Sequence, residues 1–218
     1  MSAVPMGILT SSTSIQEVQV RVMSVEFVYA CLIMARIKTG ETRKTRHVAN
    51  CEGTYVALHA QRLPKDRYER EMPMMIKMLR EMWPELPDTF LQDAALGFDD
   101  GVVWALVEVG DTYTKTCCGK TPCNHECQSD PRHAWCPARK DLCIDGNFKF
   151  LHVTRLADII PLRFAVRVRP MQGIFRAFLP AAAIQTDSMT GAQLHVWHHT
   201  QEVMQGKEPD AGTRCSAG

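Results

Sequence analysis

Six cysteines and two histidines crowd the middle of the chain, and their side chains are the ligands that zinc prefers: Cys117, Cys118, Cys123, Cys127, Cys136 and Cys143, with His125 and His133. Structural zinc takes four such ligands in a tetrahedron, and they usually come in pairs two to four residues apart because one tight turn then supplies two of them. Cys118, Cys123 and Cys127 come close to this spacing. The sequence therefore predicts a structural Zn²⁺ site.

The ligand set is open at this stage, because the spacing is not a clean pair of C-x2-C turns. The best set is Cys118, Cys123, Cys127 and Cys136, and the substitutes for any of these are Cys143 and His133. Free or disulfide-bonded cysteines are the alternative. Two observations favour zinc: the cysteine count of nine is odd, and no basic stretch precedes the first apolar residues at the N-terminus. We therefore expect an intracellular protein, nuclear or cytoplasmic and not secreted, in a reducing compartment.

A carboxylate stands directly beside the cluster, in the stretch Cys136-Pro-Ala-Arg-Lys-Asp-Leu-Cys-Ile-Asp-Gly-Asn-Phe-Lys-Phe150. Asp145, Gly146 and Asn147 separate two short apolar stretches, which is typical of a tight turn between two strands. By local chemistry, Asp145 is a turn residue.

The same stretch resembles the Kyakuja-Dileera-Zisupton (KDZ) transposases, in which a Cys-Pro-x-Cys knuckle is followed by an Asp-Gly-Asn strand. The resemblance implies that Asp145 is the first of three catalytic acids in an RNase H-like domain, and that the upstream cysteines belong to zinc knuckles. The chain departs from the family where Arg139 replaces the second knuckle cysteine.

An RNase H-like site needs two further acids to hold two divalent ions about 4 Å apart. No acid after Asp145 matches the second or third family carboxylate; these acids are Asp158, Asp187, Glu202, Glu208 and Asp210. The resemblance therefore implies a front portion with an incomplete catalytic site, and Mg²⁺ only if a complete site exists. Walker, G-x-G-x-x-G, H-E-x-x-H and G-x-S-x-G motifs do not occur either.

Arginines alternate with apolar residues in Leu162-Arg-Phe-Ala-Val-Arg-Val-Arg169, which predicts a half-buried strand. Its inner face would carry Leu162, Phe164, Val166 and Val168, and its outer face Arg163, Arg167 and Arg169. A cationic strand face suits phosphate contacts, so we predict DNA as the partner. The net charge of +1 gives no further indication.

Two other functions are open. Residues 81–111 carry eight acids and no Lys or Arg, so the protein could be a zinc-stabilised interaction module that contacts a protein partner through them. His195, His198 and His199 could mark an enzyme site, but a polar surface run is the preferred interpretation because no matching catalytic residues accompany them. No membrane partner is expected, because the apolar run 22–35 is short and contains Glu26.

The elements that must position these residues follow from periodicity. We predict a strand at Val18–Val22, then a buried helix or strand. An exposed connection follows over 36–47. Apolar residues at helical spacing predict a short helix from Pro73 to Pro84, and the apolar run 102–109 predicts a buried strand.

The predicted fold class is α+β, with a zinc-stabilised cysteine cluster followed by the opening strands of an incomplete RNase H-like domain. The predicted organisation is a flexible tail (1–14), a mixed α/β region (15–112), a cysteine-rich zinc-binding segment (113–145), a β-rich partial RNase H-like segment (146–204) and a second tail (205–218). At 45% apolar and 22% charged residues, the composition is ordinary for a globular protein.

Overall fold

The computed structural model describes residues 16–43, 45, 47–62, 64–84, 89, 100–114, 152–169, 171 and 173–206. The strands are β1 (Glu17–Glu26), β2 (Gly40–Arg43), β3 (Tyr55–Gln61), β4 (Val102–Thr114), β5 (His152–Arg167) and β6 (Ile174–Pro180). The α-helices are α1 (Phe27–Met34), α2 (Lys65–Met82) and α5 (Gly191–Met204), and short 3-10 helices are η1 (Ala49–Cys51), η5 (Ala181–Ala183) and η6 (Thr186–Ser188).

All these strands form one mixed sheet with the order β2-β5-β4-β3-β1-β6. β1 and β3 are parallel, and every other neighbouring pair is antiparallel. The connection from β1 to β3 contains α1, since parallel neighbours need a crossover. The α+β class is confirmed. Strands from residues 15–112 and from 146–204 are interleaved in this sheet, because β5 lies between β2 and β4 and β6 pairs with β1.

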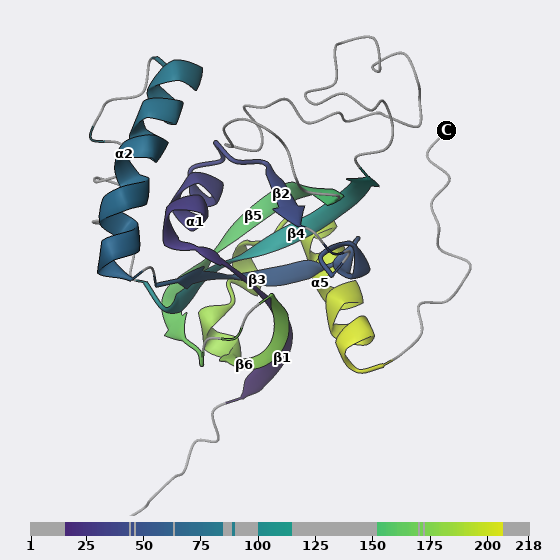
Figure 1. The fold of residues 1–218 in the computed structure, drawn as a ribbon. Coiled ribbons are helices and arrows are strands. Elements are labelled where there is room, and N and C mark those ends of the chain that lie inside the picture. The colour runs from purple at the N-terminus through teal and green to yellow at the C-terminus, as the bar shows by residue number, and fades with distance from the viewer. Residues whose placement is uncertain are drawn as a thin grey trace, which may run out of the picture.

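The helices form layers on the two faces of the sheet (Figure 1). α1 covers one face, α2 packs outside α1, and α5 covers the opposite face. The apolar run 22–35 is therefore a buried strand followed by a buried helix, which agrees with the sequence prediction. Within the described residues, no helix is both long and apolar enough to cross a membrane.

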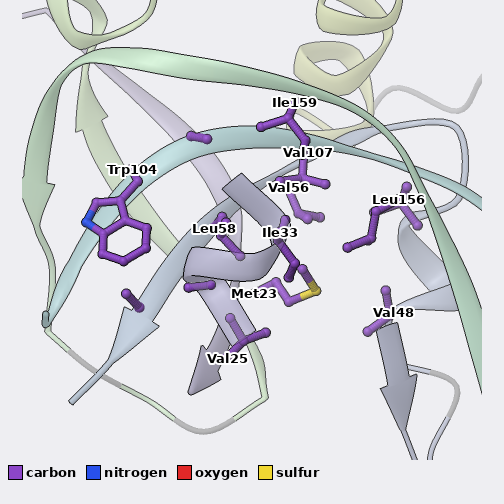
Figure 2. Close-up of a cluster of buried hydrophobic side chains, with 14 of the residues drawn as sticks. Met23, Val25, Ile33, Val48, Val56, Leu58, Trp104, Val107, Leu156 and Ile159 are labelled. Carbon is purple, nitrogen blue, oxygen red and sulfur yellow. The ribbon is translucent and has the colours of Figure 1, made fainter. Parts of the chain in front are cut away.

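α1 is apolar on all sides because it is enclosed on two sides. Ala30, Cys31 and Ile33 face the sheet, where they join Leu58 and Trp104 in one buried cluster (Figure 2). The Phe27 and Trp104 rings meet edge to face at 5.5 Å. Val28 and Leu32 face outward to α2, and Phe27, Tyr29 and Met34 are half-buried, so no residue of the helix is fully exposed.

The stripe of α2 that packs on α1 is formed by Met72, Met75, Met78 and Leu79. The predicted C-terminal end is correct, because the helix ends at Met82, two residues before Pro84. The predicted start at Pro73 is wrong, because α2 begins at Lys65 and Pro73 lies inside it. An internal proline removes one helical hydrogen bond. Pro73 is exposed, so this bond is missing on the side of the helix that faces solvent.

α5 begins with a capping box. The Thr190 side chain accepts from the Gln193 backbone N–H at 3.3 Å, and the Gln193 side chain accepts from the Thr190 N–H at 2.8 Å. Trp197 of α5 is buried in a second hydrophobic cluster, which also contains Tyr55 and Leu106 and lies between α5 and the sheet. We call this cluster the second core. The box fixes where the helix starts, and the tryptophan fixes which face it buries.

The predicted exposed connection over 36–47 is wrong. Its middle is β2, which pairs with β5 from Gly40↔Arg155 to Arg43↔His152. Lys38 is only 2% exposed, and its Nζ donates to the Gly40 carbonyl at 2.7 Å. Glu41 lies 3.7 Å from that Nζ and 2.8 Å from Arg43 Nε. The charge pattern indicated a solvated loop because sequence does not reveal that these charges neutralise one another inside the fold.

Candidate nucleic-acid interface

Three arginines predicted to contact DNA lie at the C-terminal end of β5, and all three are exposed. Arg163 donates to Asp187 of η6 at 2.8 Å. Arg167 forms the last ladder pair of β5, opposite Val102, and Arg169 follows directly after the strand. Neither Arg167 nor Arg169 forms an ion pair within the described part of the chain. These two guanidinium groups are therefore available for phosphate, and Arg163 shares its charge with the exposed Asp187.

The strand carrying these arginines is irregular. Val166 pairs with Val103, but Pro161 pairs with Ala105, so residues 162–165 lie opposite Trp104 alone. Such a bulge re-aims side chains and breaks strict alternation. Leu162 is buried, and Val166 and Val168 pack against the second core, as predicted. Phe164 was predicted to lie on the inner face, but it is 47% exposed because it lies within the bulge.

Two further exposed arginines belong to the same basic stretch of sequence. Arg155 on β5 and Arg176 on β6 are both exposed, and Asp158 is the one acid between residues 152 and 180. Neither arginine belongs to the predicted set of DNA contacts. Their place in the same basic block was the signal that could have identified them.

Asp158 does not neutralise the arginines at the strand end, because it is already engaged where β5, β3 and α5 meet. Its carboxylate accepts from Gln193 Nε2 at 2.6 Å, from Arg36 Nη2 at 3.3 Å and from the Tyr55 hydroxyl at 3.4 Å. Burial raises the pKa of the Asp158 carboxyl, but the hydrogen bonds from Gln193, the Ile159 backbone and Arg36 outweigh it and lower the pKa. Asp158 thus stays ionised and fastens α5 to the sheet.

A second carboxylate, Glu108 of β4, lies near Asp158. Burial and the negative charge of Asp158 raise the pKa of Glu108, and Arg155 partly opposes this. Burial and the same two carboxylates raise the pKa of Tyr55, so its hydroxyl remains a neutral donor. Asp158 and Glu108 do not make a metal site, because they are only two acids and the Asp158 carboxylate is already hydrogen-bonded. Within the described residues, no group of three or more possible metal ligands occurs.

The Ser24 hydroxyl and His59 Nδ1 lie 3.0 Å apart, which resembles a nucleophile and its base. Ser24 is 3% exposed and His59 is fully buried, with the Phe175 ring against the imidazole at 6.2 Å. Burial lowers the pKa of His59. No substrate reaches these buried atoms in this structure, so the pair stabilises the junction of β1 and β3.

Several predicted site residues fall outside the described residues. These are the predicted zinc ligands Cys118, Cys123, Cys127, Cys136, Cys143 and His133, together with Asp145. The described residues that flank this segment lie opposite each other. Thr114 and His152 are Cα partners in the β4–β5 ladder.

The two alternative sites have the following places. His195 and His198 are exposed on α5, and His199 is half-buried. Within residues 81–111, the stretch 102–107 and Val109 are buried in β4, while Glu81, Asp100 and Asp111 are exposed. In the described part of this segment, the acids are therefore separated by a buried strand and do not form one continuous surface.

Comparison with protein-family models finds no match, and comparison with curated proteins finds none either.

Proposed function

We propose that this protein binds DNA through an arginine surface formed by Arg163, Arg167 and Arg169 at the end of β5. The observation that carries the proposal is the exposure of Arg167 and Arg169 without any ion pair in the described part of the chain. Such groups in a nearly neutral protein attract a polyanion and release its counterions on binding.

The resemblance to KDZ transposases in residues 136–150 is a separate support. With it, the proposal is a transposon-derived, zinc-binding protein that associates with DNA. The zinc would stabilise the part of the chain between Thr114 and His152, which are Cα partners in the sheet. The RNase H-like part of the resemblance has less support. The described strands of the segment 146–204 that would open such a domain are β5 and β6, and they are not neighbours, because β5 pairs with β4 and β2.

We limit the proposal to binding. A two-metal site would need Asp145 together with two more carboxylates. The next acid along the chain, Asp158, is occupied by Gln193, Arg36 and Tyr55. A DNA-associated protein with an incomplete catalytic site is the function that these contacts support best.

The test is DNA binding measured by fluorescence anisotropy over a range of salt concentrations. We expect wild-type affinity to fall with salt, and we expect the triple variant Arg163→Gln, Arg167→Gln, Arg169→Gln to bind more weakly. Its slope of log affinity against log salt should be smaller by about one for each lost phosphate contact.

A matched control removes three charges elsewhere: Arg62→Gln, Lys65→Gln and Lys77→Gln, all at exposed positions in or just before α2. This variant should bind like wild type. Equal losses in the two triple variants would show general attraction without a defined surface. Absence of wild-type binding at low salt would reject the proposal and favour the protein-interaction alternative.

A further inference from the structure

An exposed aromatic side chain lies within the arginine surface. Phe164 is 47% exposed and follows Arg163 directly, with Arg167 three residues further on. Between Arg163 and Phe164 on one side and Arg167 on the other, Ala165 is exposed and Val166 is half-buried. Arg163 and Arg167 therefore flank Phe164 along the chain within β5.

The exposure of Phe164 has a specific backbone cause. A regular ladder would turn this side chain into the second core beside Leu162 and Val166. The bulge places residues 162–165 opposite Trp104 alone, and this takes Phe164 out of the inward-facing set. Bulges of this kind are treated as built features that re-aim a side chain.

We propose that the nucleic acid bound at this surface is single-stranded, and that one of its bases stacks on the Phe164 ring while the neighbouring arginines contact its phosphates. This inference rests on the proposed DNA binding and specifies the form of the ligand. Single-strand binders combine a cationic track with aromatic rings on which bases stack.

The arrangement favours a single strand over a duplex because the bases of a duplex are stacked on one another and their faces are covered. Arginines alone would serve either form, since both carry phosphates. A flat ring between arginines adds affinity only for a base whose face is free. The stacking contribution is sequence-tolerant, so we expect little preference among unpaired bases.

The chain offers a matched control for the ring itself. Phe178 on β6 is 58% exposed, so it is a phenylalanine of similar or greater exposure. It lies on the edge strand β6 opposite Gln19 of β1, and β6 is not a ladder neighbour of β5. Phe178→Ala therefore removes an exposed ring from another strand and leaves Phe164 and the three β5 arginines in place.

The experiment measures the affinity of the full chain for an oligo-dT of about 12 nucleotides, within the range of single-strand site sizes, and for a duplex of equal length. An oligo-U of the same length tests RNA as the source of the single strand. The variants are Phe164→Ala, Phe164→Leu, Phe164→Trp and Phe178→Ala, each checked for a wild-type thermal transition.

We expect wild type to bind the single strand more tightly than the duplex. Phe164→Ala and Phe164→Leu should weaken single-strand binding roughly 5- to 150-fold and leave duplex binding within about 2-fold, which corresponds to the loss of one stacked base. Phe164→Trp should retain binding, since tryptophan keeps an aromatic face, and Phe178→Ala should match wild type.

Three outcomes would overturn the inference: tighter wild-type binding to the duplex, full binding by Phe164→Leu, or an equal loss in Phe178→Ala. If the arginine variant loses all binding while Phe164→Ala changes nothing, DNA binding stands and stacking is rejected. If wild type binds neither form, the proposed function fails first.

Discussion

Thr114 and His152 are Cα partners at the last rung of the β4–β5 ladder, although the cysteine-rich segment separates them in the chain. The ladder between these strands continues back to Val102↔Arg167. The sheet therefore brings Thr114 and His152, the described residues on either side of 115–151, opposite each other.

The first prediction concerns zinc. We expect about one zinc per chain, lost in the double variant Cys123→Ser, Cys127→Ser. The unfolding transition of the sheet should persist, because Thr114 and His152 pair directly in the β4–β5 ladder and loop-closure cost grows slowly with length. Metal analysis and thermal unfolding measure the two quantities.

Cys215→Ser is the control, since Cys215 lies far from the cluster in sequence and should not change the zinc content. Absence of zinc in wild type would reject the predicted site. Global unfolding of the double variant would show that the segment is integral to the sheet.

Glu41 is predicted to be important for stability. Glu41→Gln leaves Lys38, which is 2% exposed, and Arg43 without their shared counter-ion. Breaking a buried pair in this way costs about 3–5 kcal/mol of unfolding free energy, measured by urea titration. Adding Lys38→Met should recover part of the loss. Glu69→Gln is the control: the Lys65–Glu69 pair is 89% and 64% exposed, and its removal should cost less than about 1 kcal/mol.

Arg36 ends α1 in the left-handed region, with φ of 58°. Its N–H donates to Ile33 and that of Ile37 donates to Leu32, the two bonds of a Schellman motif, in which glycine is usual. Arg36→Ala keeps the unfavourable φ and loses the bond to Asp158, whereas Arg36→Gly loses the bond but relieves the backbone. We expect Arg36→Gly to be the more stable of the two by about 1 kcal/mol in urea unfolding. The reverse order would show that φ at this position carries no strain.

Buried His59 predicts a pH dependence. Its pKa is lowered from 6.5 by burial, so the folded state keeps the ring neutral while the unfolded chain takes up a proton. The unfolded state then binds more protons just below pH 6.5, and stability falls as the pH drops through that range. His59→Gln should flatten this part of the curve of unfolding free energy against pH. His195→Gln, at an exposed position on α5, should keep the wild-type slope; identical slopes in all three proteins would contradict the prediction.

Sequence patterns predicted the buried elements well, because apolar periodicity reports burial directly. The run 22–35, the strand at 102–109 and the arginine face of β5 all lie where expected. The errors occur where tertiary packing and strand pairing decide whether a residue is buried. Lys38 is buried because Glu41 and Gly40 satisfy its charge, and Phe164 is exposed because two strands pair out of step.

By itself, the sequence determined the α+β class, the layers of apolar residues and the outward-facing arginines, because these depend on local periodicity and composition. Only the tertiary structure decided which strands are neighbours, that Asp158 is occupied by α5 and Arg36, and that Thr114 and His152 are Cα partners. Pairing between distant strands is fixed by the whole set of buried contacts, and no short stretch of sequence records it.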